Sequence, residues 1–486
     1  MNDKRTCTNI GFILLNFRML IFKLNFIINS ENNKYNKMKN VLIVFSILFS
    51  SFQLYCQDIM QMDVAKYKKI CQENIYKDYK GMLKEPKGVL KYPYVTPGSQ
   101  TYATQLWDWD SWFSSIALDQ ITANIGTKKD KDEVQKYEQG CVLNFLSFQK
   151  YGWIPIVISH DSPELDKYCP ENPWNVNIHK PMLAQQAAFI TQRNDGDATW
   201  LNEKFEDLQF FVNHYISNQR HKETGLYFWI NDEMIGIDND PATFFRPEKS
   251  SANIFLNCLM YKELLAMVYL CKQLNREEIG IAYANEAESL KQAIRKNCWD
   301  EWTGFYYSCD LNLLPIKAPD KFNHLHSGNP RTYSCLIQRL HTFTGFMAMW
   351  AGIATPEQAK RMVEQHYKDT ATLNCNYGIR SMSKLEKMYD LRATGNPSSW
   401  LGPVWGVSNY IVFRSLVNYG YNREAKEIAE KTILLFGKDY EQNGALHEYY
   451  LPDSGMPVLN KGFQDWNYLV INMAAWLDGN QVIHEF

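Results

Sequence analysis

Two carboxylates stand in segments of unusual composition, far apart in the chain. Asp238 belongs to the turn GIDNDP, between a glycine and a proline, and Glu448 belongs to the aromatic segment HEYY. Hydrolysis of a glycosidic bond needs such a pair: one protonated carboxyl for the leaving oxygen, and one carboxylate for water or for the anomeric carbon. Aromatic burial would raise the pKa of the acid and keep it protonated near neutral pH.

Taken singly, these acids have other interpretations. Asp238 or Asp240 in a turn can be a turn-forming or helix-capping residue, and Glu448 can be a surface charge. A calcium loop places oxygens at alternate positions and ends in a bidentate glutamate, and DNDPAT does not continue in that way. A closed fold would be needed to bring Asp238 and Glu448 together.

Helical patterns dominate the chain after residue 57. The segment 355–367 has Thr355 as its N-cap, Pro356 at the first helical position and Gln358 closing a capping box. The segment 422–437 shows helical spacing of its apolar residues, and we expect the helix to begin at Asn422 and end at Gly437.

Apolar helices alternate with amphipathic helices along the chain. The expected pairs are 112–125 with 131–148, 181–194 with 198–219, 252–274 with 277–297, 344–353 with 355–367, 404–421 with 422–437, and 464–478 closing against 59–79. Six such hairpins predict an all-α fold, the (α/α)6 toroid, as one domain. An irregular all-α protein is the alternative. Strand patterns are sparse, and 225–230 and 304–311 are expected to be short hairpins or extended loops.

Five loops rich in Trp, Asp, Glu and Pro precede apolar helices. They are LWDWDSWF (106–113), NIHKPMLAQ (177–185), GIDNDPATFFRPEKSSAN (236–253), NPSSWLGPVWG (396–406) and the segment 444–469. In a toroid they would converge on one rim, where helix N-termini offer free N–H groups. The candidate substrate-binding residues are Trp107, Trp109, Asp110, Lys180, Asn239, Trp400, Trp405, Tyr449 and Trp466.

Composition narrows the class of ligand. The 14 Trp, 29 Tyr and 26 Phe suit a sugar-binding cleft, although many must be core. A formal net charge of −2 without a basic cluster argues against a nucleic-acid partner. The 11 cysteines form no CxxC pair and no zinc spacing with histidine, so we expect no metal and no cofactor.

The N-terminal segment predicts export. Residues 38–57 combine a lysine, an apolar run of about ten residues and a short polar end, which is typical of a signal peptide. Residues 1–37 are interpreted as a spurious extension before the true start at Met38, and 58–486 as a single (α/α)6 domain. Cleavage after Cys56 and a secreted or periplasmic location are favoured over lipidation of Cys56 or a plain membrane anchor.

These motifs together resemble the family 63 glycoside hydrolases and their relatives, the trehalases and mannosylglycerate hydrolases. The resemblance covers most of residues 100–480. The segment WDWDSWF resembles the family's Trp-Asp-Ser/Thr-x-Phe motif, which implies that Trp109 and Asp110 lie in the sugar pocket. GIDNDP is similar to the segment carrying the general acid, which falls on Asp238, and HEYYLPDSG to the segment carrying the general base, which falls on Glu448. WDEWTGFYY and SSWLGPVWGVSNY resemble two further family segments.

The chain departs from the family pattern in three places. Leu401 stands where the family has arginine, GFQDWNYL carries one extra residue, and Asp240 replaces a small residue. The catalytic pair is intact, but the missing arginine makes it unsafe to transfer any relative's substrate specificity.

The sequence thus predicts a secreted, inverting, exo-acting α-glycosidase, first for glucose and next for mannose, acting on an oligosaccharide or small glycoside. An inverting pair would lie about 6.5–9.5 Å apart to leave room for water. A polysaccharide lyase on the same toroid is one alternative, but it would need a basic cleft, and the loops supply mainly Lys180, Arg246 and Lys249. A non-catalytic glycan-binding protein is the other, and it has no need of both carboxylates.

Overall fold

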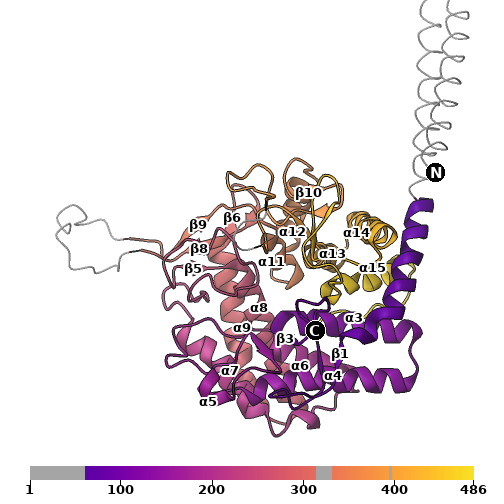
Figure 1. Ribbon diagram of the computed structural model, residues 1–486. Coiled ribbons are helices and arrows are strands. Elements are labelled where there is room, and N and C mark those ends of the chain that lie inside the picture. Colours follow the sequence, from indigo (N-terminus) through magenta and orange to yellow (C-terminus); the bar gives the residue numbers. More distant parts are fainter. Residues whose placement is uncertain (1–60, 314–330, 393–396) are drawn as a thin grey trace, which may run out of the picture. The chain divides into compact units, whose positions relative to one another are not determined.

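The computed structural model describes residues 61–313, 331–392 and 397–486. The chain divides into two compact units, Met1–Ala65 and Lys66–Phe486. The predicted extension, the signal peptide and Cys56 lie outside the described residues. The helices and strands labelled in Figure 1 all belong to the unit Lys66–Phe486.

Helices follow one another in pairs along this unit, as the apolar spacing predicted. The first three pairs are α3 (Asp108–Ile125) with α4 (Lys128–Ser147), α6 (Leu183–Arg193) with α7 (Phe205–Asn218), and α8 (Ile254–Gln273) with α9 (Glu277–Asn297). Side chains fix two of the starts. Thr127 and Asp130 form a capping box before α4, and Asn253 accepts the Phe255 N–H before α8.

The second half of the unit continues the pattern with shorter helices. Its pairs are η3 (Phe343–Phe346) and α11 (Met347–Trp350) with α12 (Pro356–Met362) and η4 (Val363–Tyr367), and α13 (Gly406–Asn418) with α14 (Asn422–Asn443). η5 (Asp465–Leu469) and α15 (Val470–Leu477) end the unit. The helix 61–78 contacts α14, where the Tyr67 hydroxyl donates to Glu441 at 2.9 Å. The predicted capping box of Thr355 and Gln358 is present, with Pro356 at the start of α12. Two short helices, α5 (Leu165–Tyr168) and η2 (Thr199–Leu201), lie in loops, and η1 (Tyr79–Met82) follows the helix 61–78.

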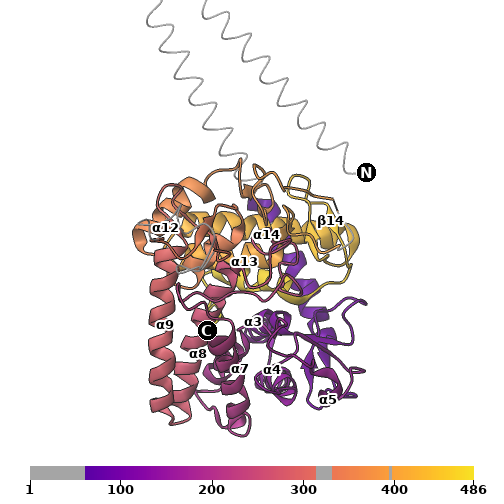
Figure 2. The same cartoon turned by 90° about the vertical axis from the view of Figure 1, so that its left-hand side faces the viewer.

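The apolar helix of each pair contacts the apolar helix of the next pair. α3 packs on α6, α6 on α8, α8 on α11, and α11 on α13, while η5 and α15 contact both α13 and α3. The sequence colours therefore pass once around the unit in Figure 1, and Figure 2 shows α8 and α9 side by side. α8 is long and apolar enough to span a membrane, but 78% of its most apolar stretch is buried, which fits a core helix.

The predicted end of α14 at Gly437 is wrong. The helix continues to Asn443, and Gly444 terminates it in the left-handed conformation with φ of 74°. Gly437 has a packing role instead: a Cβ there would lie 2.3 Å from the Cβ of Tyr67. Glycine at this position thus lets the helix that carries Tyr67 approach α14 closely.

Strands are short, and each pairing is antiparallel. The described residues form six small sheets: β1 (Leu83–Lys84) with β2 (Tyr94–Val95), β3 (Gln105–Trp107) with β4 (Val157–Ser159), β5 (Ser251–Ala252) with β8 (Ser308–Asp310) and β9 (Leu336–Gln338), β6 (Trp299–Asp300) with β7 (Phe305–Tyr306), β10 (Asn374–Cys375) with β11 (Gly378–Ile379), and β12 (Val404–Trp405) with β13 (Tyr449–Tyr450) and β14 (Pro457–Val458). Segment 304–311 supplies β7 and β8, as expected. In 225–230 Tyr227 makes only one isolated bridge, to Arg220.

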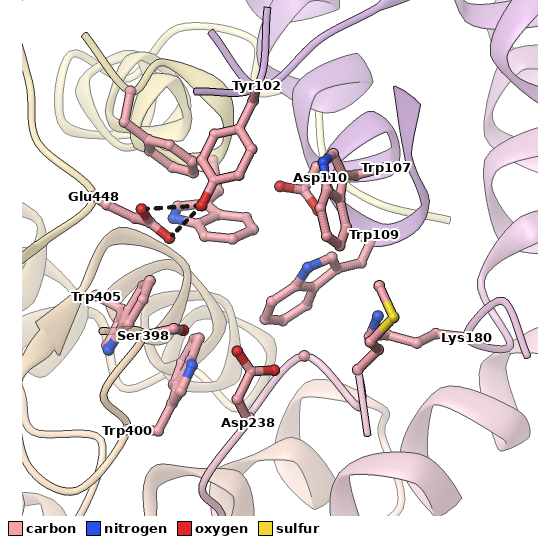
Figure 3. A pocket seen from close by; sticks show the side chains of 14 residues that line it. Tyr102, Trp107, Trp109, Asp110, Lys180, Asp238, Ser398, Trp400, Trp405 and Glu448 are labelled. Atoms are coloured by element: carbon pink, nitrogen blue, oxygen red, sulfur yellow. Dashed lines mark hydrogen bonds between the residues drawn. The ribbon is translucent and has the colours of Figure 1, made fainter. Parts of the chain in front are cut away.

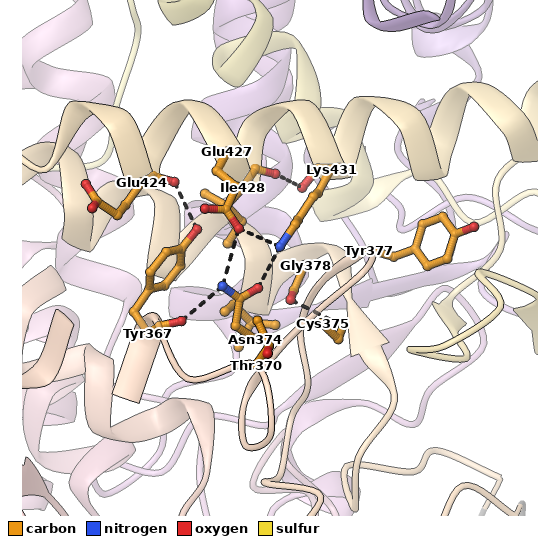
Figure 4. A network of polar contacts seen from close by, with 12 residues as sticks. Tyr367, Thr370, Asn374, Cys375, Tyr377, Gly378, Glu424, Glu427, Ile428 and Lys431 are labelled. Carbon is orange, nitrogen blue, oxygen red and sulfur yellow. Dashed lines mark hydrogen bonds and ion pairs between the residues drawn. The ribbon is translucent and has the colours of Figure 1, made fainter. Parts of the chain in front are cut away.

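A polar network fixes the β10–β11 hairpin to α14 (Figure 4). Lys431 donates to Asn374 at 2.7 Å and to Glu427 at 2.6 Å, and Asn374 donates to the Tyr367 carbonyl at 3.0 Å. Arg380, which follows this hairpin, forms a bridge with Val404 at the start of β12. The network thereby helps to position the strand that carries Trp405.

Candidate active site

All five predicted loops contribute to one cavity of about 130 Å³. Its lining residues are Tyr102, Trp107, Trp109, Asp110, Lys180, Met234, Gly236, Asp238, Ser398, Trp400, Trp405, Glu448, Phe463 and Trp466. The loops precede α3, α6, α8, α13 and α15, so the packing of the apolar helices brings them together.

Tryptophan rings form much of the cavity wall. Trp400 and Trp405 stack with centroids 4.0 Å apart and planes 3° apart, and Trp109 contacts Trp466 at 4.9 Å. Trp109 also contacts Trp400 at 5.9 Å, so the four rings form one continuous group. Such a wall presents flat apolar surface to the apolar faces of a sugar ring while the carboxylates provide polar contacts.

Asp238 and Glu448 face this cavity from different sides (Figure 3). Asp238 comes from the loop before α8, and Glu448 stands one residue before β13. The two are close enough for the charge of Asp238 to contribute to the raised pKa of Glu448. The pair can therefore address two sides of a group bound between them.

Two side chains hold the Glu448 carboxylate. The Tyr102 hydroxyl donates to both of its oxygens at 3.3 Å, and Asn460 donates from Nδ2 to Oε2 at 2.5 Å. Burial raises the pKa of Glu448 to about 7, and the charges of Asp110 and Asp238 act in the same direction. The two hydrogen bonds oppose this rise because they stabilise the charged form. Glu448 can thus change its protonation state near neutral pH.

A pair of acidic residues, Asp110 and Asp465, lies at the cavity wall. Asp110 lines the cavity, and the fully buried Asp465, whose carboxyl interacts with that of Asp110, accepts from the Ser114 hydroxyl at 2.8 Å. Burial raises the pKa of Asp110 to about 6 and that of Asp465 well above its usual value. Two interacting buried carboxylates would repel each other, so we infer that the pair shares a proton.

Asp465 lies in GFQDWNYL, the segment that carries one extra residue relative to the family pattern. Its φ of 28° belongs to the sparsely populated left-handed region. The backbone is therefore strained at Asp465.

Lys180 lines the cavity but is already paired. Its ammonium lies 2.9 and 3.0 Å from the two oxygens of buried Asp108, and its backbone N–H donates to Asp108 at 2.9 Å. The ammonium also lies 5.5 Å from the Trp109 ring centroid. A Cβ on Gly236 would approach Lys180 Cε to 2.7 Å, so glycine leaves room for this lysine. Lys180 acts here as part of the wall, with its charge balanced by Asp108.

The residues after Asp238 fix its loop to neighbouring elements. Asn239 accepts the Trp400 backbone N–H at 2.8 Å. Asp240 is buried and accepts from Asn253, the capping residue of α8. Burial raises the pKa of Asp240 to about 6. Asp240 therefore supports the capping residue and does not cap the helix itself.

Two predicted substrate-binding residues do not line the cavity. The side-chain oxygen of Asn239 accepts the backbone N–H of Trp400. The Tyr449 hydroxyl donates to the Pro397 carbonyl at 2.6 Å, and the centroid of its ring lies 4.7 Å from that of Trp405. Neither lines the cavity as predicted, and both contact residues of its wall, Trp400 and Trp405. The other predicted residues do line it: Trp107, Trp109, Asp110, Lys180, Trp400, Trp405 and Trp466, with Asp238 and Glu448.

Sequence reasoning missed several cavity residues. They are Tyr102, Met234, Gly236, Ser398 and Phe463, together with Asn460 at Glu448. Gly236, Ser398, Asn460 and Phe463 belong to loops already singled out, so the loops themselves were the available signal. Tyr102 is 346 positions from Glu448, and nothing in its spacing indicates that contact.

No group of three or more His, Cys, Asp or Glu side chains among residues 61–313, 331–392 and 397–486 is arranged to hold a metal ion. Asp110, Asp238 and Glu448 line the same cavity without forming such a group.

Residues 103–467 match the family described as Mannosylglycerate hydrolase MGH1-like glycoside hydrolase domain. The chain belongs to this family. Its members are glycoside hydrolases, so the chain is an enzyme of that class. The matched range contains both Asp238 and Glu448, together with Trp466 at its end.

Individual relatives agree with the family. Mannosylglycerate hydrolases MGH2 and MGH1 of Selaginella moellendorffii are 30% and 23% identical, each over 79% of this chain and 82% of the relative. Cytosolic neutral trehalase of Kluyveromyces lactis is 28% identical over 51% of this chain, but the match spans only 30% of that trehalase.

Solved structures show the same fold. The GH63 mannosylglycerate hydrolase of Thermus thermophilus in complex with glucose gives a TM-score of 0.58 at 18% identity, over 80% of this chain and 96% of that one. Neutral trehalase Nth1 of Saccharomyces cerevisiae gives a TM-score of 0.54 at 18% identity, over 80% of this chain and 74% of that one. The helix-rich fold is therefore that of the family's structural relatives.

Proposed function

We propose that this protein is an exo-acting, inverting α-glycosidase in which Asp238 is the general acid and Glu448 the general base. The observation that carries this proposal is the cavity itself. Two carboxylates from segments far apart in the chain face the same aromatic pocket from different sides (Figure 3).

The two carboxyls divide the reaction between them. Asp238, protonated, donates its proton to the glycosidic oxygen as the bond to the anomeric carbon breaks. Glu448, deprotonated, accepts a proton from a water that attacks the opposite face of that carbon. The Tyr102 and Asn460 hydrogen bonds favour the charged form of Glu448, which suits a base. One displacement inverts the anomeric centre.

The cavity supports attack at a chain end. The Trp400–Trp405 stack and the Trp109–Trp466 contact form the wall of the cavity that Asp238 and Glu448 line. One terminal sugar unit would occupy it, with the remainder of the substrate outside. This supports release of single sugars.

The relatives include proteins named for each of the two proposed sugars, glucose and mannose. Trehalases and mannosyl-oligosaccharide glucosidase GCS1 of Arabidopsis thaliana, 21% identical over 58% of this chain, are named for glucose-containing substrates, and the mannosylglycerate hydrolases for mannose. Leu401, at the position of the family arginine, means that no relative's substrate transfers directly.

We further propose that the six helix pairs close into the (α/α)6 toroid predicted from the sequence. Support comes from the chain of contacts through α3, α6, α8, α11 and α13, which returns to α3 through η5 and α15. In this arrangement the loops before the inner helices lie at one rim, and the cavity lined by all five loops fits that position.

Export through the N-terminal segment is also a proposal. The pattern of 38–57 supports it, and N-terminal sequencing of protein exported by a cell that expresses the full chain tests it. A mature chain beginning just after Cys56 is expected, whereas retention of residues 1–57 in the cytoplasm would oppose export.

The lyase and glycan-binding alternatives receive less support. The three basic residues that a lyase would have for uronic acids are engaged: Lys180 by Asp108, Arg246 by Asp310 and Lys249 by Asn175. A binding protein would not need the Asp238–Glu448 pair.

A panel of α-glucosides and α-mannosides, assayed for released reducing sugar, tests the proposal. Release of the terminal sugar is expected, and it should be lost in Asp238→Asn and Glu448→Gln. An unsaturated, ultraviolet-absorbing product would favour a lyase. Saturable binding without turnover across the panel would favour a glycan-binding protein.

A further inference from the structure

Two further cavities adjoin the aromatic cavity. The first, which we call the outer cavity, is lined by Asp232, Glu233, Met234, Asp238 and Phe244. The second, the side cavity, is lined by Trp153, Pro155, Ile156, Val157, Tyr168, Pro170, Val176, Asn177, Glu233 and Met234. Met234 lines all three cavities, and its side chain is 41% exposed.

Asp238 lines both the aromatic cavity and the outer cavity. A general acid must reach the oxygen that links the sugar to its leaving group. If Asp238 is that acid, the scissile bond lies where the two cavities meet. The terminal sugar then occupies the aromatic cavity, and the leaving group occupies the outer cavity.

The outer cavity is rich in negative charge. Asp232 and Glu233 lie there beside Asp238. Among the described residues lining the three cavities, the single lysine or arginine is Lys180, and Asp108 already binds it through both carboxylate oxygens. An anionic leaving group would meet like charges there, and like charges repel most strongly at low ionic strength.

Apolar surface accompanies this charge. Phe244 and Met234 line the outer cavity. In the side cavity the ring centroids of Trp153 and Tyr168 lie 5.8 Å apart. Aromatic and thioether surfaces suit the apolar face of a neutral sugar or an uncharged alkyl group. The hydroxyl groups of a neutral leaving group can donate to the Asp232 and Glu233 carboxylates.

We propose that Asp232 and Glu233 make the leaving-group site selective for neutral leaving groups and reject carboxylate-bearing ones such as glycerate. This rests on the proposed role of Asp238. Water supplies the oxygen that bonds to the anomeric carbon, and the leaving group departs as a neutral alcohol carrying the Asp238 proton. The substrate class would then differ from that named in the mannosylglycerate hydrolases, despite the family membership.

Matched substrates test this inference. The α-mannosyl and α-glucosyl glycerates each carry one negative charge, and their methyl esters are neutral but otherwise the same. We expect kcat/KM for the better ester to exceed that for its acid by roughly tenfold or more at low salt. The ratio should fall as salt rises, because screening weakens the repulsion of the acid.

Variants locate the effect. Asp232→Asn with Glu233→Gln should reduce the ester-to-acid ratio several-fold. The control Glu203→Gln removes an exposed carboxylate that lines none of the three cavities and should leave the ratio unchanged.

The outcomes separate this inference from the proposed function. Hydrolysis of both substrates with equal kcat/KM at low salt, or a preference for the acid, overturns the selectivity and leaves the glycosidase proposal intact. A ratio that Asp232→Asn with Glu233→Gln does not change also overturns it. If neither these substrates nor the α-glycoside panel releases sugar, the proposed function fails, and this inference fails with it.

Discussion

The hydroxyl of Tyr102 lies 3.3 Å from each oxygen of the Glu448 carboxylate. A single donor thus bridges both oxygens of the proposed base, from a residue that precedes the first helix pair. Asn460 donates to the same carboxylate and to the Tyr102 hydroxyl at 3.1 Å, which completes a small network. The network stabilises the charged form of a group that burial would otherwise keep protonated.

Tyr102→Phe should shift the pH dependence of activity. Glu448 must be deprotonated to act as a base, so kcat/KM is expected to fall as the pH drops through about 7, the pKa of Glu448. Loss of the Tyr102 hydrogen bond destabilises the carboxylate and raises its pKa further, which moves this limb to higher pH by about 0.5–1 unit. A pH profile of kcat/KM measures the shift.

Tyr76→Phe is the matched control for that profile, because the Tyr76 hydroxyl bonds to Asn124 away from the cavity. The fall of kcat/KM at low pH should occur at the same pH in Tyr76→Phe as in the unchanged protein. If kcat/KM of Tyr102→Phe falls at the same pH as that of the unchanged protein, the assignment of Glu448 as the titrating base is contradicted.

The acid and the base should respond differently to the leaving group. Asp238→Asn and Glu448→Gln should each reduce kcat on an ordinary α-glycoside by about 10²–10⁴-fold. On an α-glycosyl fluoride, whose leaving group needs little protonation, Asp238→Asn should recover most activity and Glu448→Gln should not. The opposite pattern would exchange the two roles, and near-normal activity of Asp238→Asn on a poor leaving group would make Asp240 the candidate acid.

Asp465→Asn should stabilise the fold at high pH. A carboxyl whose folded pKa is raised binds a proton in the folded state after the unfolded chain has lost it, so its presence costs stability as pH rises above the unfolded value near 4. The asparagine side chain of this variant cannot ionise and can still donate to Asp110. The free energy of unfolding of the variant should therefore exceed that of the unchanged protein by about 1–3 kcal/mol at pH 8, with little difference at pH 4.

Denaturant unfolding at the two pH values measures this difference. Equal effects of Asp465→Asn at pH 4 and pH 8 would show that the Asp110–Asp465 pair does not share a proton. Ser114→Ala is a useful comparison because it removes the hydrogen bond to Asp465 but keeps both carboxyls.

Gly437→Ala should destabilise the packing of α14. The new Cβ would lie 2.3 Å from the Tyr67 Cβ, and such overpacking costs about 1–3 kcal/mol, more than the helix propensity that alanine gains. Gly280→Ala in α9 is the comparison, because its nearest neighbour, Cys271 Cβ, would be 3.2 Å away. Thermal unfolding should show a larger loss for Gly437→Ala, and equal losses would contradict the close approach of the helix that carries Tyr67.

Regular helical spacing made the helix pairs predictable from the sequence. Apolar positions three and four residues apart mark a buried face wherever they occur, so α4, α9, α12 and α14 were visible locally. The composition of the loops between them indicated where a polar aromatic cavity would form. Gly437 was misread because a helix-ending glycine and a close-packing glycine look alike in sequence, and only Tyr67, far away in the chain, distinguishes them.

Individual side-chain directions were less predictable than the loops that carry them. Asn239 follows Asp238 directly, yet it turns to the Trp400 N–H, and Tyr449 follows Glu448 and packs against Trp405. Tyr102 and Asp465 reach the site through contacts that depend on chain closure. Such contacts have no local periodicity, so a single sequence carries no signal for them.

The anomer released from an α-glycoside tests the central claim most directly. Asp238 and Glu448 acting as acid and base on opposite faces of the sugar must invert the anomeric carbon in one step. Proton NMR during the first minutes of hydrolysis, before mutarotation, should therefore show the β-anomer of the released sugar. First appearance of the α-anomer would contradict the account, because it would require a covalent intermediate and a nucleophilic carboxylate in place of a general base.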